Sequence, residues 1–142
     1  MLFFAPYANT EYLPLEPPKA FILVGHCAAD CGSLESTIEQ ALPGVTVLEA
    51  DSRESLIDHI ARWSSCAVLL VNRVLDGQFK NDCGVKLIEE LITNDDTPAM
   101  MLISNYPDAQ MAAMNLGALQ GFGKSQLHES QTAHLLRQAA IS

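Results

Sequence analysis

A short apolar run in the middle of the chain, residues 68–71 (Val-Leu-Leu-Val), limits the possible folds more than any other feature. The run follows the polar segment Trp63-Ser64-Ser65 and stops at Asn72. A segment that is so short and apolar on both faces is typical of a strand buried in the middle of a parallel sheet. Ligands of such sheets bind where the strands reach their carboxyl ends. We therefore expect Asn72 at a candidate site, where an amide can form hydrogen bonds but is a poor nucleophile.

Four further apolar runs of strand length alternate with helical patterns along the chain. The strand candidates are residues 20–25, 45–48, 98–104 and 119–123. The helix candidates open at the caps Ser33, Asp51 or Ser52, and Asp108, or cover residues 84–94 and 130–140. This alternation, with short connections, predicts right-handed crossovers and one parallel sheet of five strands with helices on both faces.

The charge balance argues against two classes of partner. The 142 residues include eight Lys and Arg against seventeen Asp and Glu, a net charge of −9. Nucleic acids and anionic membranes are bound by clustered basic residues, so we expect neither as a partner. The N-terminus carries no basic residue before Pro6, unlike a signal peptide, and no stretch approaches transmembrane length. These features predict a cytoplasmic protein.

The first 18 residues differ in composition from the rest of the chain. They hold four of the seven prolines and several aromatic residues, and Pro17-Pro18 marks a firm boundary. We therefore expect an extended N-terminal arm over residues 1–18 and a single domain over residues 19–142. The arm either lies along the domain or uses its aromatic residues to dock on a partner or on a second copy of the chain.

The cysteines do not form a recognisable disulfide or metal pattern. They are Cys27, Cys31, Cys66 and Cys83, and no Cys-x-x-Cys pair occurs. A core-rich domain of this size needs no disulfides, so we expect free thiols. His26, Cys27 and Cys31, with Asp30 between them, could present soft ligands near a crevice, although a structural zinc site requires four ligands. A small-ligand or metal-sensing module that uses these residues and Asn72 is the alternative function.

Four stretches of the sequence resemble one family in their order and spacing. They are Lys19-Ala-Phe-Ile-Leu23, Leu69-Leu-Val-Asn-Arg-Val-Leu75, Pro98-Ala-Met-Met-Leu-Ile-Ser104 and Leu116-Gly-Ala-Leu-Gln-Gly-Phe-Gly-Lys124. They resemble the start of the first strand, the phosphoacceptor strand, the fourth strand and the Gly-Ala-x-x-aromatic-x-x-Lys stretch of response-regulator receiver domains, the CheY-like family. The resemblance extends from Lys19 to the C-terminus. It implies a flavodoxin-like (βα)5 three-layer sandwich whose five-stranded parallel sheet has the strand order 2-1-3-4-5.

The resemblance also shows which functional residues of that family this chain lacks. The phosphoacceptor aspartate corresponds to Asn72, and the acidic pair closing the first strand corresponds to Gly25 and His26 (or to His26 and Cys27 with a slip of one residue). An amide cannot form an acyl phosphate, and Mg²⁺ requires oxygen ligands that usually include carboxylates. We therefore expect a degenerate phosphoacceptor pocket with no metal, no cofactor and no enzymatic activity.

Three residues of the family's switch remain in this chain. Lys124 is expected to point toward Asn72 and to donate to its amide oxygen. Ser104 occupies the position of the switch hydroxyl, and Phe122 that of the aromatic residue that swings between an inward and an outward rotamer. Ser125 replaces the proline that usually follows the lysine, which removes the usual reason for a cis peptide bond there.

These features predict a signalling domain that binds a protein independently of phosphorylation. The expected contact face covers residues 108–138, and its partner is a signalling protein or a second copy of the chain, as a homodimer. Met111 and Met114 are expected as core filler, unless they lie exposed beside the aromatic switch residue and form an adaptable contact surface. Whether Asp30 or Asp76 enters the pocket and partly restores its acidity stays open.

Overall fold

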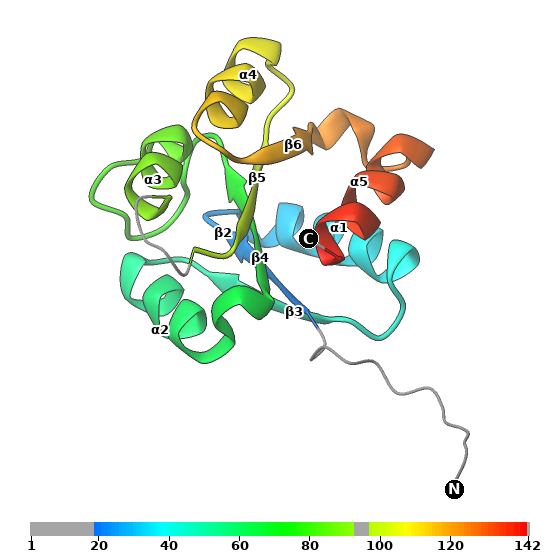
Figure 1. Cartoon of the computed structure of the whole chain (residues 1–142), viewed down its shortest axis with the longest axis horizontal. Helices are drawn as coiled ribbons and strands as arrows, with labels where there is room; N and C mark the ends of the chain where they lie inside the picture. The colour runs from blue at the N-terminus through cyan, green and yellow to red at the C-terminus, as the bar shows by residue number, and fades with distance from the viewer. Residues whose placement is uncertain (1–18, 93–96, 142) are drawn as a thin grey trace, which may run out of the picture.

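The computed structural model describes residues 19–92 and 97–141, and its centre is a parallel sheet. The strands are β2 (Ala20–Val24), β3 (Thr46–Ala50), β4 (Ala67–Asn72), β5 (Ala99–Ile103) and β6 (Leu119–Phe122). They pair in the order β3-β2-β4-β5-β6, as Figure 1 shows. This is the order 2-1-3-4-5 along the chain, so the predicted flavodoxin-like fold is confirmed. The predicted N-terminal arm falls outside the described residues.

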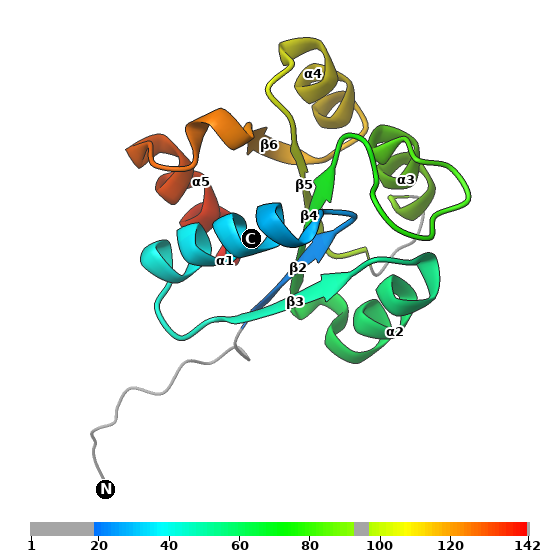
Figure 2. The ribbon, with the colours of Figure 1, turned by 180° about the vertical axis from the view of Figure 1, so that it is seen from behind.

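Helices cover both faces of the sheet. They are α1 (Ala28–Ala41), α2 (Arg53–Trp63), α3 (Gly84–Leu91), α4 (Pro107–Asn115) and α5 (Ser130–Ala140). α1 and α5 pack on one face, and α2, α3 and α4 pack on the other (Figures 1 and 2). Within the described ranges, no helix is both long enough and apolar enough to cross a membrane.

The central strand β4 is buried on both faces, as its sequence predicts. Val68 and Leu70 belong to the cluster under α1 and α5, whereas Leu69 and Val71 belong to the cluster under α2, α3 and α4. All four side chains are fully buried, and each such burial contributes about 1.5–3 kcal/mol. The strand ends at Asn72, which is only half-buried and lies at the carboxyl edge of the sheet.

The first helix begins earlier than predicted. The structure places Ser33 inside α1, where its hydroxyl donates to the carbonyl of Ala29 (3.2 Å) instead of capping the helix. The cap position is Cys27, whose backbone is extended and whose side chain forms no capping hydrogen bond. The additional first turn carries Asp30 toward the carboxyl edge of the sheet.

The starts of two other helices test the remaining capping predictions. Ser52 caps α2, and its hydroxyl accepts a hydrogen bond from the backbone N–H of Ser55 (3.1 Å), which confirms one of the two predicted alternatives. The prediction for α4 is wrong by two residues. Its cap is Tyr106, Pro107 occupies the first turn, and Asp108 lies inside the helix. Proline fits this position because its missing N–H would have no helical partner there.

Candidate functional site

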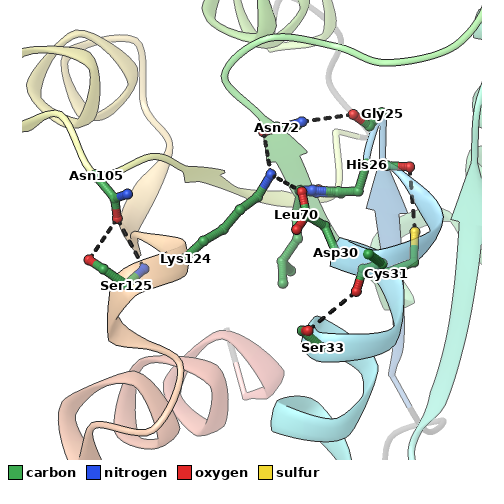
Figure 3. A network of polar contacts seen from close by, with 11 residues as sticks. Gly25, His26, Asp30, Cys31, Ser33, Leu70, Asn72, Asn105, Lys124 and Ser125 are labelled. Carbon is green, nitrogen blue, oxygen red and sulfur yellow. Dashed lines mark hydrogen bonds and ion pairs between the residues drawn. The ribbon is translucent and has the colours of Figure 1, made fainter.

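The candidate site lies at the carboxyl edge of the sheet, where β2 and β4 end side by side and a side chain that follows β6 reaches across (Figure 3). Val24 and Val71 are paired across β2 and β4, so the next residues, Gly25 and Asn72, are neighbours at this edge. Lys124 follows β6 and reaches over the edge toward Asn72. The parallel topology thus assembles residues from three separate parts of the sequence.

The Asn72 amide is hydrogen-bonded through both its nitrogen and its oxygen. Its Nδ2 donates to the carbonyl of Gly25 (2.9 Å), and its Oδ1 accepts from Lys124 Nζ (3.2 Å), as expected from the sequence. A carbonyl can only accept and an ammonium can only donate, so the orientation of the amide is determined by its partners. A carboxylate at this position could keep the bond to Lys124 but could not donate to Gly25.

Asp30 joins the pocket by forming an ion pair with Lys124. Its Oδ2 lies 2.7 Å from Lys124 Nζ, and both side chains are about one-third exposed. The hydrogen bond from Lys124 lowers the pKa of this carboxyl below its ordinary value. Asp76 contributes differently, because its backbone N–H, rather than its carboxylate, donates to the carbonyl of Gly25 (2.9 Å). The pocket therefore regains one acid, and that acid is already bonded to the lysine.

His26 is a buried, neutral imidazole at the same edge. Its side chain is 8% exposed, and its Nε2 lies 2.9 Å from the carbonyl of Leu70, so Nε2 carries the proton. Its Nδ1 is buried and has no hydrogen-bond partner among the described residues. Burial, assisted by the positive charge of Lys124, lowers the pKa of His26 to about 4. His26 therefore adds neither a carboxylate nor a positive charge at neutral pH.

The backbone at Gly25 leaves no room for an acidic side chain. This residue has a φ of +74°, which is unfavourable for residues with a side chain. A Cβ atom at this position would also lie 2.6 Å from Leu75 Cδ2 and 3.0 Å from Leu75 Cα. The loop that follows β4 thus packs against Gly25 so closely that a carboxylate side chain does not fit at this position.

A shallow crevice of about 180 Å³ opens beside Asn72. Ser104 lines it, and its hydroxyl accepts a hydrogen bond from the backbone N–H of Tyr106 (3.0 Å). The Arg73 guanidinium lies over the Tyr106 ring at 4.6 Å from the ring centroid, and both residues line the crevice. The sequence did not predict Arg73 or Tyr106 as site residues, although Arg73 directly follows Asn72.

The serine that follows Lys124 uses a hydrogen bond that proline could not form. The backbone N–H of Ser125 donates to Asn105 Oδ1 (3.2 Å), and its hydroxyl donates to the same oxygen (2.9 Å). These bonds hold the turn after β6 against the loop after β5. No cis peptide bond occurs within residues 19–92 and 97–141.

The switch residues occupy two different environments. Phe122 is 3% exposed and points inward, whereas Met111 is 59% and Met114 is 40% exposed. The prediction that these two methionines fill the core is therefore wrong, because they lie on the outer side of α4. All three residues line a groove of about 630 Å³ formed by α4, β6 and α5.

The residues of the alternative ligand site do not form a shared cluster. Cys27 is exposed, whereas Cys31 is buried and its thiol donates to the backbone carbonyl of His26 (3.6 Å). Burial raises the pKa of the Cys31 thiol to about 11, which disfavours the thiolate that a metal requires. The described part of the chain contains no group of three or more His, Cys, Asp or Glu side chains arranged to hold a metal ion.

Comparison with known proteins gives a structural match but no sequence match. No family model and no curated protein matches the chain. The signal receiver domain of a DNA-binding response regulator from Colwellia psychrerythraea is 14% identical and has a TM-score of 0.66, over 89% of this chain and 100% of that one. The receiver domain of NtrX from Brucella abortus is 17% identical and has a TM-score of 0.63, over 87% and 99%.

A third solved structure gives the same result. The response regulator receiver domain from Rhodospirillum rubrum is 11% identical and has a TM-score of 0.59, over 86% of this chain and 92% of that one. Similarity at these identities establishes the architecture and no more. The chain therefore has the fold of a response-regulator receiver domain.

Proposed function

We propose that this chain is a non-phosphorylatable, receiver-like signalling domain that acts by binding a protein. The observation that carries the proposal is the Asn72 amide, which is held by Gly25 on one side and by Lys124 on the other. An amide nitrogen bonded to a carbonyl is a poor nucleophile. Asn72, at the end of β4, instead forms hydrogen bonds to Gly25 after β2 and to Lys124 after β6, and it needs no phosphoryl group to do so.

The surroundings of Asn72 support the same conclusion. Mg²⁺-assisted phosphoryl transfer needs carboxylate oxygens to hold the metal. The pocket offers a neutral imidazole at His26, no side chain at Gly25, and one carboxylate, Asp30, already paired with Lys124. Asp30 thus gives Lys124 the anionic partner that a phosphoryl group would supply in a phosphorylated relative. We propose that this contact keeps the domain in one constitutive state, with Phe122 inward.

The proposed contact surface is the groove formed by α4, β6 and α5. Its exposed thioethers, Met111 and Met114, are flexible and polarizable, which suits an adaptable protein interface. The polar residues Gln120 and Gln131 also line the groove and would provide hydrogen bonds at its rim. A signalling protein is the proposed partner, and a homodimer would use the same surface.

The test is exposure to a phosphoryl donor and to a phosphoryl mimic. We expect acetyl phosphate with Mg²⁺ to add no mass to the protein, and beryllofluoride with Mg²⁺ to cause no saturable NMR shifts near Asn72. The Asn72→Asp variant should behave in the same way, because restoring the acceptor does not restore the acids missing at Gly25 and His26. A phosphorylatable receiver domain serves as the positive control. A stable phosphoryl adduct on the wild-type chain would overturn the proposal.

A further inference from the structure

Another cavity lies away from both the crevice beside Asn72 and the groove of α4, β6 and α5. It is formed by the start of α2, the connection from β4 to α3, and α3 itself. Its volume is about 560 Å³, within the range of small-molecule sites. The lining residues are Arg53, Phe79, Lys80, Asn81, Lys86, Leu87 and Glu90. None of them lines the crevice beside Asn72. A ligand bound here would therefore contact none of the residues that line the crevice beside Asn72.

The cavity gathers positive charge in a strongly acidic chain. Three of the eight Lys and Arg residues line it, together with one acid, Glu90. Glu90 is bonded to Arg53 (2.7 Å), whereas Lys80 and Lys86 form no ion pair with any described residue. Both lysines are exposed, so their ammonium groups can reach a ligand. The chemistry of the cavity therefore favours an anion.

The loop that carries Phe79, Lys80 and Asn81 is held in place by its backbone. The N–H of Gln78 donates to the carbonyl of Asp51 (2.7 Å), and the N–H of Leu75 donates to that of Asp82 (2.7 Å). Gly77 has a φ of +113°, and a Cβ atom there would collide with the Asp51 carbonyl. A loop pinned at these points loses little conformational entropy when a ligand binds.

One wall of the cavity is aromatic and another can donate hydrogen bonds. Phe79 is half-buried, packs against the core beneath α2 and α3, and lines the cavity, as does Leu87. Asn81 is exposed, and its Oδ1 accepts from the N–H of Cys83 (2.9 Å), which leaves its amino group available as a donor. A planar ring could pack against Phe79 while a phosphate contacts the two lysines, which carry the charge.

We propose that this cavity binds a nucleoside phosphate, with its base against Phe79 and its phosphates against Lys80 and Lys86. A site of this kind also accounts for the length of the connection between β4 and α3, which curves past α3 toward the start of α2 (Figure 2). The connection supplies three of the lining residues.

The experiment is an NMR titration of the ¹⁵N-labelled full chain with ADP, adenosine and inorganic phosphate in parallel. ADP should cause saturable shifts over residues 78–87 and should bind more tightly than either fragment. Lys80→Gln and Lys86→Gln should each weaken ADP binding about threefold to fivefold, the effect of one partly exposed ion pair. Phe79→Leu keeps apolar packing but removes the ring, and it should also weaken ADP binding.

Arg62→Gln is the matched control, because Arg62 is an exposed cation in the last turn of α2 and does not line the cavity. It should leave the affinity for ADP unchanged. The proposal is overturned if ADP causes no saturable shifts, or if the two lysine variants bind ADP as the wild-type does. Inorganic phosphate or adenosine binding as tightly as ADP would exclude a nucleoside phosphate as the specific ligand.

Discussion

At the scale of single residues, His26 links the stability of the fold to pH. Burial lowers its pKa from 6.5 to about 4 in the folded chain. Between these values the unfolded chain binds a proton that the folded chain does not, so stability falls as pH falls. The contribution of His26 is fully present above pH 6.5 and is lost progressively as the pH decreases through 4. The total effect is about 3 kcal/mol.

Urea denaturation at several pH values measures this contribution. Between pH 7 and pH 4.5 the wild-type chain should lose about 2 kcal/mol more stability than the His26→Gln variant. Glutamine is the suitable control, because its amide can still donate to the Leu70 carbonyl but does not titrate. Asp30 titrates below this window, since the Lys124 hydrogen bond lowers its pKa. Parallel pH profiles for the two proteins would show that His26 is not the responsible group.

At the scale of the elements, Gln110 connects α4 to the sheet. Its Nε2 donates to the carbonyls of Leu102 (2.8 Å) and Ser104 (3.1 Å), and its Oε1 accepts from the N–H of Gly121 (3.2 Å). One side chain therefore bridges α4, β5 and β6. Gln110→Ala should lower the free energy of unfolding by about 1–3 kcal/mol, because it leaves these backbone groups without partners.

Hydrogen exchange separates this effect from a general loss of stability. The amide of Gly121 should exchange faster in Gln110→Ala than its lower global stability explains. Gln120→Ala is the control, because Gln120 is an exposed glutamine on β6. That variant should change stability by no more than about 0.5 kcal/mol. Equal exchange of Gly121 in both variants would contradict the bridging role of Gln110.

The sequence patterns were sufficient to predict the five strands and the last helix. Each predicted run forms a strand, and α5 covers the predicted residues 130–140, because the periodicity of apolar residues reports directly on burial. The start of α1 was missed because Cys27 provides no capping side chain and Gly32 lowers the apparent helix propensity. That error also concealed the position of Asp30, which enters the pocket only because α1 begins at Ala28.

The site itself was predictable only where topology determines it. The pairing of parallel strands brings Gly25 beside Asn72, and the chain direction after β6 brings Lys124 to the same edge. The ion pair to Asp30 and the stacking of Arg73 on Tyr106 depend on side-chain directions and loop paths. No periodicity encodes these features, so they emerge only from the three-dimensional packing.

At the scale of the whole molecule, charge is distributed unevenly. The net charge of −9 favours expansion through self-repulsion, whereas the cavity between α2 and α3 is locally positive. Salt screens both effects, and the Debye length shortens from about 30 Å at 0.01 M to about 10 Å at 0.1 M. The stability of the fold and the binding of an anion should therefore respond to salt in opposite directions.

Raising NaCl from 0.02 M to 0.2 M should increase the free energy of unfolding by about 0.5–1 kcal/mol, because it screens repulsion among the seventeen acidic residues. The ion pair between Asp30 and Lys124 is partly exposed and loses little on screening. Urea denaturation and the ADP titration in the same two buffers measure both responses. A decrease in stability with salt would instead show that local ion pairs outweigh the net repulsion in this chain.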